Sequence, residues 1–172
     1  MNAHCTTQFT ATCPVKRAVT VRGVYSAIRV SDLIGGADIQ TTHARITILN
    51  VGPRVVAKVE HGLIDYSGQQ GSVELSAGWE INLNFTSRSF AGEMKATAEG
   101  SVKVLLPHGF TTSFAASTTK DAAFVCRADI APHIQHREEV GRVIHTFGQG
   151  TPPVRLLSMK GPIVIDNQPA AS

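Results

Sequence analysis

Apolar and polar residues alternate along most of this chain in short runs, as in INLNF (81–85) and VKV (102–104). A two-residue period places every second side chain on the same face of a strand, and it is not the period of a helix. Valine, isoleucine and threonine, which strands prefer, are frequent in these runs. The pattern therefore predicts an all-β protein.

The alternating runs are themselves repeated at an interval of 18 residues. Residues 37–54 (ADIQTTHARITILNVGPR) and 55–72 (VVAKVEHGLIDYSGQQGS) both read as strand, break, strand and Gly-containing corner. A fixed period near 20 residues is the signature of a solenoid, whose turns bury their apolar faces on one another. The landmarks that coincide are Ala37 with Val55, Ile39 with Ala57, His43 with His61, Ile46 with Ile64, and Ile48 with Tyr66.

The same pattern defines one solenoid domain over residues 19–166. Residues 1–18 are expected to be an N-terminal extension and 167–172 a disordered tail, and a stretch at about 119–145 breaks the repeat as an excursion. The expected fold is a parallel β-helix, or β-solenoid, of roughly six to seven turns. The segments read as further turns, or as the opening of one, are 19–36, 73–85, 93–107, 111–118 and 153–166.

Register predicts both the core and the corners. Gly62, Gly78, Gly100 and Gly161 stand at the mid-turn break, where a sharp bend is expected to need the backbone freedom of glycine. The residues predicted to point inward are Ile39, Ile46, Ile48, Val59, Ile64, Tyr66, Leu75, Ile81, Leu83, Val102 and Val104.

Composition narrows the class of partner. The chain is 42% hydrophobic with one Trp and two Tyr, which suits a thin aliphatic core, and its formal charge is +3. No basic run is interleaved with aromatic residues, so a nucleic-acid partner is not expected. No segment approaches ~18 uninterrupted apolar residues, so no transmembrane segment is expected.

The N-terminal sequence carries no recognisable signal peptide, because no basic head precedes an apolar stretch. Cys5 and Cys13 could form a disulfide in an oxidising compartment and leave Cys126 free, but three reduced thiols are the favoured reading. No Cys/His spacing predicts a zinc site, and no cofactor is expected.

The repeat resembles the DUF4097 family of bacterial adhesin-type proteins and its DUF2807 relatives. The resemblance implies a single-stranded, right-handed β-helix in a cell-envelope or extracellular protein, with no established catalytic residues. His43-Ala44 and Lys160-Gly161 stand where the family has Ser-Gly or Asn-Gly, so no shared surface motif indicates a ligand. The segments that carry the resemblance are 21–40, 59–85, 96–118 and 143–166.

Outward positions of stacked strands should form columns, one with Thr47, Asp65, Asn82 and Lys103, another with Gln40, Lys58, Ser76 and Thr97. A sugar-binding or ion-binding face is one reading, and an ordinary solvated face is favoured over it. Acidic residues are scattered among lysines, so no cleft is expected to gather two carboxylates around a substrate. No catalytic residue is therefore assigned, and the protein is not expected to be an enzyme.

Histidines supply the only specific constellations. His43 and His61 occupy equivalent corner positions and are weak candidates for sharing a metal, with a third ligand needed from a neighbour. The favoured reading is a stacked pair without metal. In the excursion, a helical turn would place His133, His136 and Glu139 on one face, although a polar excursion without a helix is favoured.

These observations favour a non-catalytic, adhesin-like or cell-envelope scaffold or binding module. Its partner is expected to be a protein or an envelope glycan, bound at the excursion around His133–His145 or at an open end of the solenoid. The first alternative is a carbohydrate-binding or carbohydrate-processing β-helix. The second is a cytoplasmic scaffold that self-associates end to end or edge to edge through unpaired strands.

Overall fold

The computed structural model describes residues 8–10 and 18–169 and contains strands with one short 3-10 helix, η1 (Ala131–His133). The strands are β1 (Gln8–Thr10), β2 (Val19–Ser31), β3 (Ala37–Leu49), β4 (Arg54–Gly68), β5 (Gln70–Ala77), β6 (Glu80–Phe85), β7 (Ala91–Ala98), β8 (Ser101–Leu106), β9 (Phe114–Thr119), β10 (Phe124–Cys126), β11 (Gln135–Glu139), β12 (Arg142–Phe147), β13 (Val154–Ser158) and β14 (Ile163–Asn167). None of the described residues forms a helix with the length and apolarity needed to cross a membrane.

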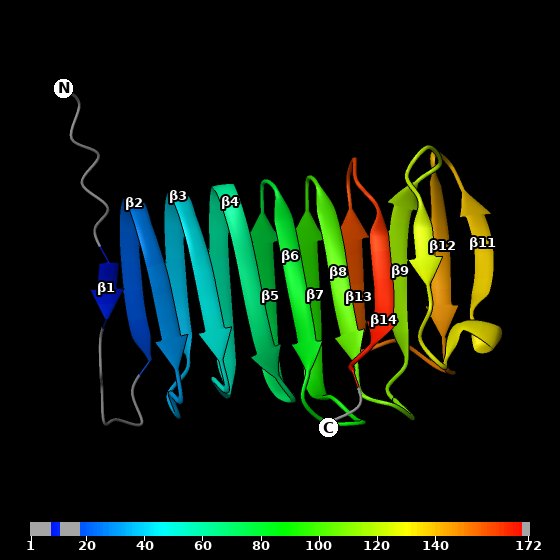
Figure 1. Ribbon diagram of the computed structural model, residues 1–172, viewed down its shortest axis with the longest axis horizontal. Coiled ribbons are helices and arrows are strands. Elements are labelled where there is room, and N and C mark those ends of the chain that lie inside the picture. Colours follow the sequence, from blue (N-terminus) through cyan, green and yellow to red (C-terminus); the bar gives the residue numbers. More distant parts are fainter. Residues whose placement is uncertain (1–7, 11–17, 170–172) are drawn as a thin grey trace.

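The strands stack in parallel layers, and the predicted β-solenoid is confirmed (Figure 1). Strands β2, β3 and β4 each span a whole layer, whereas later layers are split into two strands. The first part of β4 (54–59) pairs with β5, and its second part (63–68) pairs with β6. We call the side with the first halves of β2–β4 and strands β5, β7, β13 and β9 the first sheet. The second sheet has the second halves of β2–β4 and strands β6, β8, β14 and β10.

The 18-residue register predicted for the first turns is confirmed. Strands β3 and β4 pair in parallel with His43 opposite His61 and Ile46 opposite Ile64. The two predicted outward columns are also confirmed, since Asp65 lies between Thr47 and Asn82 in one column, and Lys58 lies between Gln40 and Ser76 in the other.

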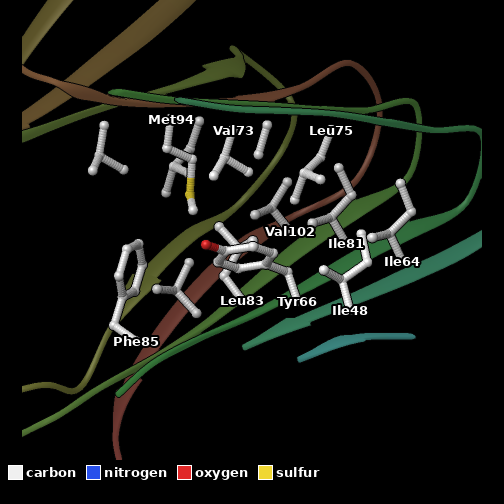
Figure 2. Close-up of a cluster of buried hydrophobic side chains, with 14 of the residues drawn as sticks. Ile48, Ile64, Tyr66, Val73, Leu75, Ile81, Leu83, Phe85, Met94 and Val102 are labelled. Atoms are coloured by element: carbon white, nitrogen blue, oxygen red, sulfur yellow. The ribbon is translucent and has the colours of Figure 1, made fainter. Parts of the chain in front are cut away.

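The core fills the space between the two sheets. All eleven residues predicted to point inward are buried, and Ile64 and Ile81 are completely enclosed. Figure 2 shows Val73, Leu75 and Met94 of the first sheet facing side chains of the second. Tyr66 is buried among these aliphatic side chains, and its burial raises the pKa of its hydroxyl to about 12.

Replacing Ile81 by Ala is expected to lower the free energy of unfolding by about 2–5 kcal/mol, because a narrow core cannot collapse around the cavity. Denaturant unfolding measures this loss. The matched control is Ile34→Ala, since Ile34 is 71% exposed and its truncation should change stability by less than about 0.5 kcal/mol. Equal effects of the two substitutions would contradict the register.

The glycines predicted at the mid-turn break are at the corner, but the reason for them differs from the expected one. Gly62, Gly78 and Gly100 have ordinary φ angles. A β-carbon on Gly78 would lie inside the van der Waals radius of the Glu60 carbonyl oxygen in the previous layer. Gly62 and Gly100 meet carbonyls in the same way. Glycine is therefore required by the close approach of adjacent layers and not by backbone freedom.

The order of the layers departs from the order of the chain. The last turn, β13–β14, lies between β7–β8 and β9–β10 (Figure 1). Strand β13 pairs in parallel with β7 on one side and β9 on the other, and β14 pairs likewise with β8 and β10. The chain therefore leaves a one-layer gap after β8 and returns to fill it.

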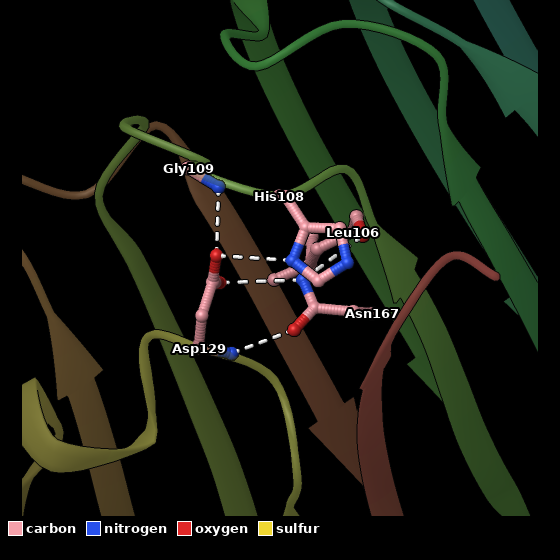
Figure 3. A network of polar contacts seen from close by, with 5 residues as sticks. All are labelled: Leu106, His108, Gly109, Asp129 and Asn167. Carbon is pink, nitrogen blue, oxygen red and sulfur yellow. Dashed lines mark hydrogen bonds and ion pairs between the residues drawn. The ribbon is translucent and has the colours of Figure 1, made fainter. Parts of the chain in front are cut away.

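A network of hydrogen bonds connects this inserted turn to the neighbouring layers (Figure 3). Asp129, which follows β10, accepts hydrogen bonds from the backbone N–H of Gly109 at 2.8 Å and from Asn167 Nδ2 at 3.2 Å. Its own N–H donates to Asn167 Oδ1 at 2.7 Å. The Gly109 N–H, above all, holds the pKa of Asp129 below its usual range, followed by contacts from Asn167 and His108. The network thus joins the ends of β8, β10 and β14.

Part of the predicted excursion at 119–145 belongs to the solenoid. Strand β10 pairs with β14 in a regular layer. Beyond it, β11 and β12 form an antiparallel hairpin, and β12 pairs antiparallel with β9. The hairpin therefore extends the first sheet past the last layer of the second.

The predicted ends of the domain need small changes. Residues 8–10 of the expected extension pair in parallel with β2 as β1. Asn167 ends β14, and Gln168 donates hydrogen bonds to Asn84 Oδ1 and to the Phe85 carbonyl, both at 2.7 Å. The remaining tail residues 170–172 lie outside the described residues, as do Cys5 and Cys13, a possible disulfide for which reduced thiols are the favoured reading. Cys126 is a free thiol, and burial raises its pKa.

Candidate binding surfaces

His43 and His61 form a stacked pair at the corner between β3 and β4. Their ring centroids are 4.9 Å apart with an interplanar angle of 44°. Within residues 8–10 and 18–169, no group of three His, Cys, Asp or Glu side chains is arranged to hold a metal ion. The pair has the predicted geometry, and the described part of the chain adds no third ligand to it.

Titration with zinc or nickel is expected to give weak or no saturable binding, because a stable zinc site needs more than two imidazoles. Isothermal titration calorimetry of the wild type and of His61→Ala tests this. Tight saturable binding that the substitution removes would contradict the expectation and establish a metal site at this corner.

The hairpin brings His136 and His145 together, and leaves the other two candidates of the excursion apart. His136 and His145 are directly opposed on β11 and β12, with their Nδ1 atoms 2.7 Å apart. His133 ends η1, and Glu139 lies at the far end of β11 beside Arg137. Because β11 is a strand, residues three apart point to opposite faces. The helical arrangement considered for His133, His136 and Glu139 does not form.

His145 caps the end of the core. Its ring is 6% exposed and stacks on Phe124 of the second sheet, with centroids 3.8 Å apart and an angle of 7°. Its Nε2 lies 3.4 Å from Thr118 Oγ1. Burial, and secondly the neighbouring charge of His136, lower the pKa of His145 to about 4. This environment is that of a packed neutral imidazole.

The free energy of unfolding is therefore expected to fall as the pH drops below about 6.5. In this range His145 becomes protonated in the unfolded chain but stays neutral in the folded protein. The loss grows until the pH reaches about 4, the folded pKa, and amounts to at most about 3 kcal/mol. Urea unfolding at several pH values compares the wild type with His145→Phe, which keeps the stacking ring. Identical pH slopes for the two proteins would refute the assignment.

A groove of about 430 Å³ runs over the outer face of the second sheet. Its apolar part comes from Leu49 of β3, Leu105 of β8 and Val164 of β14, and Leu105 is 40% exposed. Strands β3, β4, β6, β8 and β14 all contribute, so hydrogen-bonded layers support the whole floor. This is the largely apolar concave surface that ligand sites favour.

Polar groups of the predicted column border the groove. Asp65 accepts hydrogen bonds from Arg45 Nε at 2.7 Å and from Asn82 Nδ2 at 2.9 Å. Lys103 pairs with Glu80 at 2.7 Å. Burial tends to raise the pKa of Glu80, but hydrogen bonds from Lys103, Ser101 and Asn82 outweigh it and hold this pKa below its usual range. Hydrogen bonds and ion pairs thus link the side chains of this column from one layer to the next and hold them in place.

Two grooves are each lined by two carboxylates, and the expectation that no cleft gathers two carboxylates around a substrate stays a prediction. The groove is lined by both Asp65 and Asp166. A second groove of about 460 Å³, on the first sheet, contains Glu74 and Glu93. Glu74 and Glu93 come from the adjacent strands β5 and β7, whereas β6 and β8 separate the strands of Asp65 and Asp166. In the first groove Arg45 binds Asp65, and Arg127 binds Asp166 at 3.2 Å.

Sequence reasoning missed the apolar floor of the groove. Leu49 and Leu105 occupy outward positions of one column, with Ser67 and Asn84 between them. The register could have indicated this floor, because leucines at outward positions of a strand column form an apolar patch on a surface that is otherwise polar.

Comparisons with protein-family models, with curated proteins and with solved structures found no match. The structure itself defines the fold, a parallel β-solenoid with an inserted last turn and a groove on one sheet.

Proposed function

We propose that the protein is a non-catalytic binding module of the adhesin-like or cell-envelope scaffold kind, and that the groove on the second sheet receives its partner. The observation that carries the proposal is the aliphatic floor of Leu49, Leu105 and Val164 within a polar border. Exposed apolar surface rimmed by polar groups is typical of interaction sites. The envelope setting rests on the resemblance of the repeat to adhesin-type proteins.

A protein segment is the partner that suits this floor. Aliphatic side chains pack against leucine and valine and gain free energy from the area removed from water. Asn82 and Lys103 at the border offer groups for hydrogen bonds to a partner backbone. Because the floor is a hydrogen-bonded sheet, little ordering is needed when a partner docks.

Carbohydrate processing is the second candidate, since Asp65 and Asp166 share the groove. A glycosidase needs one carboxyl as a proton donor and one as a base or nucleophile. The arginine contacts at 2.7 Å and 3.2 Å occupy oxygen atoms that proton transfer would use. This occupation favours binding over catalysis.

A photo-crosslinking amino acid at position 105 tests the proposal, with the same amino acid at Val24 as control, because Val24 is 58% exposed and borders none of the grooves described. A protein cross-linked at 105 and not at 24 is then purified and titrated against the wild type, Leu105→Glu and Val24→Glu. The proposal predicts that only Leu105→Glu loses affinity. Equal affinity of the three proteins, or cleavage of a glycan that Asp65→Asn abolishes, would overturn it.

A further inference from the structure

Aromatic residues recur at one corner of successive layers. Tyr25, His43, His61 and Trp79 follow one another at 18-residue intervals. The backbone of Tyr25 is in register with His43, and His43 with His61. The Trp79 N–H donates to the Gly62 carbonyl at 3.1 Å, which places Trp79 in the next layer beside the residue that follows His61. His43, His61 and Trp79 therefore follow one another at this corner, with one aromatic residue per layer, and we call these three residues the ring column.

Trp79 is an exposed member of this column. It is the only tryptophan of the chain, and 61% of its surface is exposed. The next two layers place Gly100 and Gly161 at this corner, where the Ser101 N–H donates to the Trp79 carbonyl at 3.0 Å and the Gly161 N–H to the Gly100 carbonyl at 3.2 Å. Neither glycine brings a side chain to the corner, and the residues before them, Glu99 and Lys160, form an ion pair at 3.4 Å.

Polar groups accompany the rings on the side of the first sheet. A depression of about 250 Å³ is lined by Arg22, Gln40, Thr42, Lys58 and Glu60, among others. Thr42 and Glu60 directly precede His43 and His61 in the chain. Donors and acceptors of hydrogen bonds therefore lie next to the ring column over several layers.

We infer that this corner, with Trp79, His61 and His43 as its ring column, binds an oligosaccharide chain. The faces of aromatic rings carry negative partial charge, which attracts the C–H groups on one side of a sugar ring. Hydroxyl groups of the same sugars need the paired donors and acceptors that Arg22, Gln40 and Glu60 supply. A repeating ligand also matches a repeating column, whose histidine centroids are 4.9 Å apart. The site lies away from the groove and does not depend on the function proposed for it.

Tryptophan fluorescence tests the inference at the site itself, because Trp79 is the only tryptophan. The full chain is titrated separately with cellohexaose, chitohexaose and hexagalacturonic acid. At least one of the three is expected to change the emission of Trp79 in a saturable manner. Titration calorimetry with that sugar should show an affinity loss of about tenfold for Trp79→Ala, and a smaller one for Trp79→Phe, which retains a ring.

Two controls separate this site from the rest of the molecule. Leu105→Glu in the groove and Val140→Ala at the fully exposed tip of the hairpin should bind the sugar as the wild type does. Retention of binding by Trp79→Phe guards against misfolding of the alanine variant. Absence of a saturable change with all three sugars, or unchanged affinity of Trp79→Ala, would overturn the inference and leave the proposed role of the groove intact.

Discussion

Ending the chain at Pro152, which removes β13 and β14, is expected to unfold the region from His108 to Phe147. Strand β10 bonds only to β14 among the described strands, and β9 loses one of its two neighbours. The deletion also removes four buried core residues, each worth about 1.5–3 kcal/mol of transfer free energy, namely Val154, Leu156, Ile163 and Ile165. Hydrogen exchange followed by mass spectrometry should show peptides of this region exchanging as in denaturant, while β3 and β4 stay protected.

The matched control is a chain that ends at Gln168, which keeps both strands and the contacts of Gln168 with β6. Its exchange should equal that of the full chain. Protection of β9 and β12 in the shorter chain would contradict the account, because it would show β9 closing directly on β7 without the inserted turn.

Replacing Gly78 by Ala is expected to lower the free energy of unfolding by more than about 3 kcal/mol, since overpacking against backbone leaves no side chain that can move aside. The added β-carbon would collide with the Glu60 carbonyl of the layer below. The layers would have to separate at the corner, and this would weaken the backbone hydrogen bonds between adjacent strands in both sheets. Denaturant unfolding with circular dichroism measures the effect.

Gly52→Ala is the control for this substitution. A β-carbon at Gly52 would meet only the Gln70 side chain, at 3.8 Å, which is ordinary contact. Its effect should stay within about 1 kcal/mol. If Gly78→Ala is tolerated as well as Gly52→Ala, the layers do not approach as closely at the corner as the structure has them.

The architecture could be predicted because a constant repeat interval determines which residues of successive layers lie opposite each other. An 18-residue interval that superimposes Ile46 on Ile64 also places His43 beside His61 and fills the core with the residues of one face. Alternation within each run then decides which side chains point inward. These inferences need only local pattern and constant spacing.

The inserted turn could not be predicted in this way. Any layer can stack on any other with a matching apolar strip, so the pattern of residues 153–166 does not say where in the stack they belong. The position depends on long-range contacts such as those of Asp129 with Gly109 and Asn167. Such contacts join side chains and loops that carry no repeat.

The hairpin carried a signal that the helical reading missed. RVIHTF (142–147) is rich in the β-branched and aromatic residues that strands prefer, and Gly141 precedes it at a position with φ +73°, where glycine is favoured. Counting back across that turn pairs His145 with His136. The three-residue spacing of His133, His136 and Glu139 fits a helix, but in a strand residues three apart point to opposite faces.

The most direct test of the proposed function is methyl NMR of the protein with the partner captured at position 105. The account predicts that the methyl signals of Leu49, Leu105 and Val164 shift as the partner is added, while those of Val24 and Val140 stay in place. It also predicts that the partner is recovered chemically unchanged. Shifts confined to the hairpin, or conversion of the partner to a product, would contradict a non-catalytic binding module with its site on the second sheet.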